Sequence, residues 1–237
     1  YGIISVVSSL ISFFSIFFLL ALHGAGTRYT YKYIQHPEKI ERLWGTIFTF
    51  VLVNSTFLAL LLLVFHQYTI EFFAQGIPFF PFLLLAILNV TLNSWYLLFQ
   101  AYLQSHQVGK QVGINNFLHF AQTLSLTLFF VVVFRLQAFG VLLAQLITNI
   151  TFVVYTFIRF VPRIKLGIDR KILKEAIRYS FPLIPHNLSG WGMAMTDKIL
   201  LNNLLSTSVA GIYNIGFQMG NLLNVISTGV NKAFVPW

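Results

Sequence analysis

Long uncharged apolar stretches constrain the fold of this chain more than any other feature. A helix that crosses a bilayer needs ~20 mostly apolar residues. Seven stretches of about that length occur, at residues 3–23, 44–65, 79–104, 113–134, 139–160, 181–204 and 208–231. Only 9% of the 237 residues are charged, against roughly 25% in soluble domains. The pattern predicts an all-α integral membrane protein, a helical bundle with about seven transmembrane helices.

The basic residues are distributed very unevenly between the two sides of this predicted bundle. On one side of the bundle, the breaks between spans hold a single basic residue, Arg135. Lys198 lies within a span. Basic loops mark the cytoplasmic side of a membrane protein. We therefore expect residue 1 outside and residue 237 in the cytoplasm, and we attribute the net charge of +9 to topology rather than to nucleic-acid binding. The remaining basic residues share the other side: Arg28, Lys32, Lys39, Arg42, Lys110, Arg159, Arg163, Lys165, Arg170, Lys171, Lys174, Arg178 and Lys232.

The linker at 161–180 is basic and carries its own helical pattern. From Asp169, the run DRKILKEAIRYS places charged residues on one helical face and apolar residues on the other: Ile172, Leu173, Ala176 and Ile177. One interpretation is a basic amphipathic helix on the inner membrane surface. The alternative is a solvated linker helix.

This linker also predicts the domain organisation. We expect an N-terminal lobe of five spans at 1–160, the cytoplasmic linker at 161–180, and the start of a C-terminal lobe with two spans at 181–237. A span begins almost at Tyr1 and no tail follows the last span, so we interpret the chain as a fragment. It has no cysteine, which excludes disulfides and thiolate metal sites. We expect no cofactor, metal site or catalytic residue.

Three predicted spans carry polar side chains three or four residues apart, which places them on one helical face. Such faces form interhelical hydrogen bonds, worth ~0.6 kcal/mol each, or line a water-filled cavity. The length of the stripes favours the cavity. They contain Asn89, Asn93, Tyr96, Gln100 and Gln104; Asn115, Asn116, His119, Gln122 and Thr123; and Asn214, Gln218, Asn221, Asn224, Thr228 and Asn231.

A fourth stripe is made of small residues. Ser5, Ser8, Ser12 and Ser15 share one face of the span 3–23. Small residues at this spacing permit close helix packing, so we assign them to packing rather than to the cavity.

The segment SFPLIPHNLSGWGMAMTDKILLNNLL at 180–205 combines apolar residues with ones that are unfavourable in lipid. Pro182 suits a helix start, whereas Pro185 is expected to bend the helix or leave a carbonyl unpaired. Asn187 is a further candidate cavity residue. Asp197 has three possible roles: a structural clamp, an ion or proton site, or a substrate contact. Lys198 is long enough to reach the outer interface.

The run RYSFPLIPHNLSGWGMAMTDKILL, followed by SVAGIYNIGFQMG, resembles the polysaccharide-biosynthesis flippases of the MATE-like exporter superfamily. The opening YG and the stretch GAGTRYTYKY are similar to the same family. The resemblance implies a two-lobe transporter, with the seven spans as its second to eighth helices. It implies alternating-access transfer of an undecaprenyl-pyrophosphate-linked oligosaccharide to the outer leaflet of a bacterial inner membrane. Membrane lipids and a polysaccharide polymerase are the other expected partners.

Site roles follow from this resemblance. Amide faces suit a hydroxyl-rich sugar, because Asn and Gln both donate and accept hydrogen bonds. Arg28 and Lys32 are expected to attract the pyrophosphate. Lys198 stands where the family usually has Arg, which leaves it a point-charge role.

Three alternatives remain. A multidrug or cation antiporter of the same superfamily needs membrane carboxylates, and Asp197 is the only acid well within a span. An enzyme would need a motif such as DxD or HExxH, and neither occurs. A non-transporting scaffold would leave the polar stripes unexplained.

Overall fold

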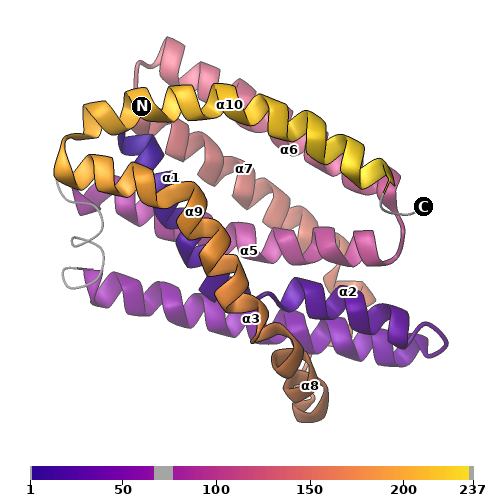
Figure 1. Cartoon of the computed structure of the whole chain (residues 1–237). Coiled ribbons are helices and arrows are strands. Elements are labelled where there is room, and N and C mark those ends of the chain that lie inside the picture. Colours follow the sequence, from indigo (N-terminus) through magenta and orange to yellow (C-terminus); the bar gives the residue numbers. More distant parts are fainter. Residues whose placement is uncertain (1, 67–76, 235–237) are drawn as a thin grey trace.

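The computed structural model describes the backbone of residues 2–66 and 77–234, with side chains as far as residue 221 apart from residues 194, 195, 198, 199 and 207. Regular secondary structure in these residues is entirely helical (Figure 1). Within them, five helical segments are long and apolar enough to cross a membrane, and each coincides with a predicted span. These segments are Gly2–Leu19, Pro37–Val64, Phe79–Ser105, Gly109–Val133 and Gln137–Arg163. The chain is therefore an all-α, multi-pass membrane protein, as predicted.

The five segments form a bundle around one central helix, α5 (Leu84–Ser105), which packs against α1 (Gly2–Leu19), α3 (Pro37–Val64) and α7 (Gln137–Arg159). Helix α6 (Gly109–Leu128) lies at the edge of the bundle against α7. Short turns extend three of these helices: η1 (Phe79–Leu83), η2 (Phe129–Val133) and η3 (Val161–Arg163).

Two apolar cores hold the bundle together, one toward each end. The first surrounds Trp44 and Phe160, and the second surrounds Leu10 and Leu142. The end with the first core also gathers the connections that carry basic residues. A recess of about 600 Å³ there is lined by Thr30, Pro37, His106 and Arg163, from three connections that are distant in sequence. We call this end the basic end.

The stretch after the first span differs from the prediction. Residues 24–43 fall between two predicted spans, but residues 24–32 lie in a helix, α2 (Leu22–Lys32). Helix α1 ends at Leu19, and the left-handed residues Leu20 and Ala21 (φ 48° and 54°) turn the chain into α2. Tertiary packing explains the helix: the Trp44 ring lies 2.6 Å from where a Cβ on Gly26 would be, and Trp44 Nε1 donates to Thr30 Oγ1 at 2.8 Å.

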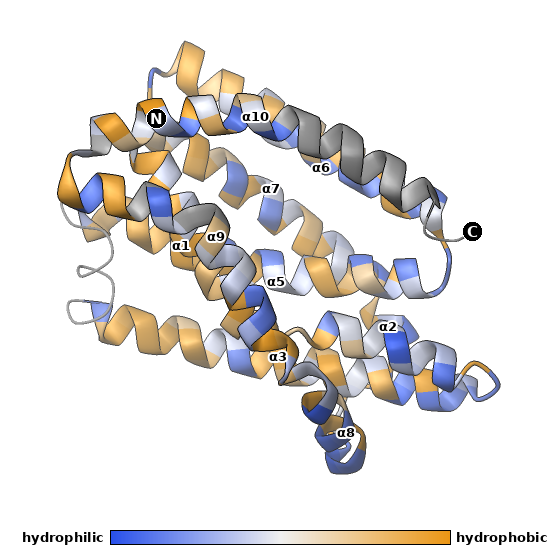
Figure 2. Cartoon of the chain, viewed as in Figure 1, coloured by the Kyte–Doolittle hydropathy of each residue, from blue (hydrophilic) through white to orange (hydrophobic). Residues whose placement is uncertain are grey.

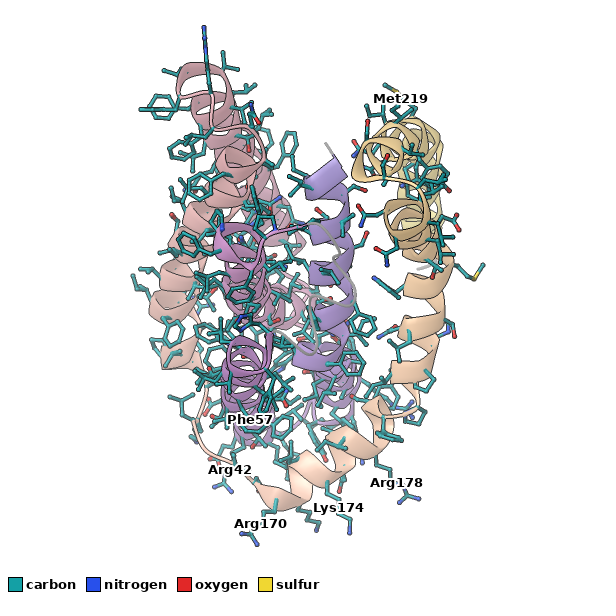
Figure 3. All side chains as sticks on the ribbon, turned by 90° about the vertical axis from the view of Figure 1, so that its left-hand side faces the viewer. Arg42, Phe57, Arg170, Lys174, Arg178 and Met219 are labelled. Carbon is teal, nitrogen blue, oxygen red and sulfur yellow. The ribbon has the colours of Figure 1, made fainter. Side chains whose placement is uncertain are left out.

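The amphipathic linker helix is present as α8 (Arg170–Ser180). Asp169 caps it by accepting from the Lys171 and Ile172 backbone N–H groups at 2.9 and 3.2 Å. Its apolar face, with Ala176 fully buried, packs on α2 and α3. Protein, rather than lipid or water alone, therefore covers that face. Its cationic side chains point away from the bundle, as Figure 3 shows for Arg170, Lys174 and Arg178. Polar residues also dominate α2 and α8 in Figure 2.

The last two predicted spans correspond to α9 (Leu183–Leu204) and α10 (Thr207–Phe234), which pack against α1 and each other. Neither is among the five segments above. Pro185 does not interrupt α9, and the change of direction that it was expected to cause falls one turn earlier. Because α9 begins at Leu183, Pro185 falls in its first turn, where a missing N–H removes no helical hydrogen bond. The change of direction occurs at Phe181 and Pro182, between α8 and α9.

Candidate functional site

A polar cavity of about 490 Å³ lies among four membrane-spanning helices of the bundle. Helix α1 contributes two serines, α5 and α6 contribute residues of their predicted stripes, and α7 contributes two amides. Tyr96 and His119 line it, but none of its described lining residues is Asp, Glu, Lys or Arg. The lining residues are Ser8, Ile11, Ser12, Asn89, Asn93, Tyr96, Leu97, Asn116, His119, Phe120, Thr123, Gln145 and Asn149.

Two buried amides form the floor of this cavity. Asn149 Nδ2 donates to Asn89 Oδ1 at 2.8 Å, which joins α7 to α5. Asn89 Nδ2 donates in turn to the carbonyls of Leu85 and Leu142 at 2.9 and 3.2 Å. Both amides are at most 5% exposed. Asn89 therefore holds α5 and α7 together. Asn93 lies one turn further along α5 and contributes a half-buried amide to the cavity.

Two aromatic side chains form one side of the polar cavity. The rings of Tyr96 and His119 stack with centroids 5.2 Å apart and planes 7° from parallel. His119 Nε2 lies 3.3 Å from Asn149 Oδ1, which fixes the imidazole against α7. The hydroxyl of Tyr96 and the amide of Gln100 are buried without a well-formed hydrogen bond to any described residue. Gln100 does not line the cavity itself.

The α6 stripe divides between two recesses. Asn116, His119 and Thr123 line the polar cavity, whereas Asn115 and Gln122 line a separate groove against α7. Neighbouring positions on a helix point ~100° apart, so a stripe of mixed spacing reaches two faces.

The candidates on α9 and α10 whose side chains the structure describes lie outside the cavity. Asn187 is half-buried, Asn214 is 6% exposed and Gln218 is exposed. Asn221 is half-buried, and the side chains of Asn224 and Lys198 lie outside the described residues. Their functional roles stay predictions.

Asp197 has a definite partner. Its Oδ2 accepts from the hydroxyl of Tyr213 at 2.8 Å, and this bond links α9 to α10. Of the three roles considered for Asp197, the geometry favours the clamp.

Arg28 and Lys32 face α8 rather than the cavity. The Arg28 guanidinium lies 4.7 Å from the Tyr179 ring centroid, and Lys32 Nζ lies 3.8 Å from Glu175 Oε2. The Tyr33 hydroxyl donates to the same carboxylate at 3.3 Å. Burial, together with the Glu175 charge, raises the pKa of Tyr33. A role in attracting pyrophosphate remains a prediction for both cations.

Sequence reasoning missed four polar lining residues. Ser8 and Ser12 belong to the stripe that we assigned to packing, and Gln145 and Asn149 belong to a span in which no stripe was identified. A signal existed for both pairs, because each has an i, i+4 spacing. Spacing alone does not distinguish a face that packs from one that lines a cavity.

One comparison with known proteins gives a match, and that match agrees with this architecture. Neither the curated proteins nor the solved structures include a match to the chain. A family model described as polysaccharide biosynthesis protein matches residues 1–237. A bundle of membrane-spanning helices around an uncharged polar cavity, matched over its whole length by that model, places the chain in the polysaccharide biosynthesis protein family, with a role in polysaccharide synthesis.

Proposed function

We propose that this chain forms part of a transporter that flips a lipid-linked oligosaccharide from the cytoplasmic to the outer leaflet of a bacterial inner membrane. The carrier lipid would be undecaprenyl pyrophosphate. In this proposal residues 1–160 belong to one lobe, 161–180 connect the lobes, and 181–237 begin the second lobe. The observation that carries the proposal is the uncharged polar cavity on membrane-spanning helices of a polysaccharide biosynthesis protein.

The chemistry of the lining suits a sugar. Amide and hydroxyl side chains both donate and accept hydrogen bonds, which matches the alternating character of sugar hydroxyl groups. A volume of about 490 Å³ falls within the range of ~300–1,000 Å³ typical of ligand sites. Tyr96 is only 4% exposed, so the half-buried His119 stacked on it is the ring of this pair that offers apolar surface to the C–H face of a sugar.

The position of α1 suggests how transport is coupled to movement. One face of α1 contributes Ser8 and Ser12 to the cavity, and the Ser9 carbonyl accepts from Trp191 Nε1 of α9 at 2.9 Å. Alternating access requires one lobe to rock against the other. A shift of α9 against α1 would act directly on one wall of the cavity.

A cation or drug antiporter is the second candidate. Such a protein needs an acidic group to attract its cation or proton. The described cavity lining includes neither Asp nor Glu, and Asp197 is bonded to Tyr213 away from it. The composition of the cavity therefore favours the sugar.

The test uses cells in which the gene is deleted and then restored as wild type or as a variant. Asn93→Leu keeps the side-chain size but removes a half-buried cavity amide. We expect lipid-linked oligosaccharide to accumulate on the cytoplasmic leaflet, with transport lowered about tenfold, as lost polar contacts imply. Gln104→Leu, at an exposed position of the same helix outside the cavity, is the matched control. Normal surface glycan in the deletion strain, with raised drug sensitivity, would overturn the proposal in favour of the antiporter.

A further inference from the structure

A second recess, distinct from the polar cavity, runs between α6 and α7. It measures about 540 Å³ and is mostly apolar, with a few polar atoms. Its α6 side repeats every three or four residues and therefore follows one helical face. The lining residues are Gln111, Asn115, Leu118, Ala121, Gln122 and Ser125 from α6, with Thr151, Phe152 and Tyr155 from α7. We call this recess the α6–α7 groove.

One buried polar group in the groove is incompletely satisfied. Asn115 is 2% exposed, and its Oδ1 accepts from Gln111 Nε2 at 2.9 Å. Its Nδ2 has no hydrogen-bond partner among the described residues. The neighbouring Tyr155 hydroxyl also receives a hydrogen bond from Gln111, at 3.1 Å. A buried donor without an acceptor is costly, so this amide calls for an acceptor atom from outside the chain.

The surroundings identify the kind of molecule that brings this acceptor. Both helices span the membrane, and Leu118 on the rim is 50% exposed, so the groove opens toward lipid. Lys110 precedes the lining residue Gln111, and Arg159 lies one helical turn beyond the lining residue Tyr155; both cations are exposed. The ion pairs found in the described residues, Lys32–Glu175 and Lys165–Glu41, involve neither cation.

We propose that the α6–α7 groove binds an anionic phospholipid. One acyl chain lies along Leu118, Ala121 and Phe152, and the buried Asn115 side chain turns outward so that an ester or phosphate oxygen accepts from its Nδ2. The headgroup charge faces Lys110 and Arg159. A zwitterionic lipid satisfies the amide but leaves both cations without net negative charge. This site does not depend on the proposed transport activity.

Native mass spectrometry of the purified chain, titrated with phosphatidylglycerol or phosphatidylcholine, tests the proposal. We expect wild type to bind phosphatidylglycerol preferentially. Ala121→Phe fills the groove and should lower this binding about tenfold. Leu124→Phe adds a ring on an exposed part of α6 that lines neither recess, and should leave binding unchanged.

Two further variants separate the groove's contacts from a folding defect. Asn115→Leu removes the unpaired donor and should weaken phosphatidylglycerol binding about fivefold without lowering the unfolding temperature. Arg159→Gln should reduce the preference over phosphatidylcholine. Equal binding of the two lipids, or unchanged binding in Ala121→Phe and Asn115→Leu, would overturn the proposal. Dimers that disappear in Ala121→Phe would assign the groove to a second copy of the chain and also overturn it.

Discussion

The bundle of α1–α7 and the pair α9–α10 are both helical, but they are held in different ways. In the bundle, the large side chains of Trp44, Phe48 and Phe99 are at most 1% exposed. In the pair, the buried described side chains are small or polar, such as Ala210 and Asn214. Helix formation alone therefore does not reveal which helices share an apolar core.

Helix α1 belongs to both regions. On the bundle side, Asn54 Nδ2 donates to the carbonyls of Phe17 and Phe18 at 3.0 and 3.1 Å. On the other side, Trp191 Nε1 donates to the Ser9 carbonyl, and its ring lies 4.8 Å from that of Phe13. Regions with few buried apolar contacts open locally at lower free energy. We therefore expect α9–α10 to move against α1 while the bundle core stays intact.

The largest expected effect comes from a glycine in the bundle. A methyl group on Gly45 would overlap the backbone carbonyl of Lys165, where the linker docks on α3. Gly45→Ala should lower the free energy of unfolding by about 3 kcal/mol, because the backbone of Lys165 cannot move aside as a flexible side chain can. SDS titration in mixed micelles measures this change.

The matched control is Gly190→Ala in α9. No atom outside the local helix lies within 4 Å of a Cβ at Gly190. This variant should be neutral or stabilise by up to about 1 kcal/mol. Equal destabilisation by both variants would erase the contrast between the two regions.

The next effect tests the bundle side of α1. Asn54→Leu leaves two carbonyls in the last turn of α1, which lack helical partners, without their side-chain donor. We expect the free energy of unfolding to fall by about 1–2 kcal/mol. The same SDS titration applies, and Val53→Leu, at a 54% exposed neighbour, should have no comparable effect.

A smaller, local effect is expected on the other side of α1. Trp191→Phe removes the bond to Ser9 but keeps an aromatic ring near Phe13. Amide hydrogen exchange in α9 should accelerate about fivefold, as expected for one lost hydrogen bond. Exchange in α3 and α5 should not change. Faster exchange throughout the bundle would show that α9 is part of its cooperative unit.

The smallest expected effect concerns Asp197. Asp197→Asn keeps an oxygen that accepts from the Tyr213 hydroxyl, so exchange in α9–α10 and complementation of the deletion strain should match wild type. Asp197→Leu removes the acceptor and should loosen the contact. If Asp197→Asn abolishes complementation while exchange is unchanged, the carboxylate charge itself is required, which supports the ion or proton role.

Several elements could be predicted from local sequence. Each of the five confirmed spans is an apolar stretch of membrane length, and α8 follows from its helical period and the Asp169 cap. The cavity could be predicted only in part. The stripes on α5 and α6 supplied Asn93, Asn116 and His119, but the same reasoning grouped them with Gln100, Asn115 and Gln122, which lie elsewhere.

The sequence by itself determined the membrane class, the places of the main helices and the residues that share a helical face, because these depend on length and period within one segment. Only the tertiary structure decided that α2 is a helix under Trp44, that α8 rests on α2 and α3, and that Ser8 and Ser12 line a cavity. The physical reason is that a helical face acquires its role from what covers it. That neighbour is a distant segment, lipid or water, and no spacing along one helix specifies which.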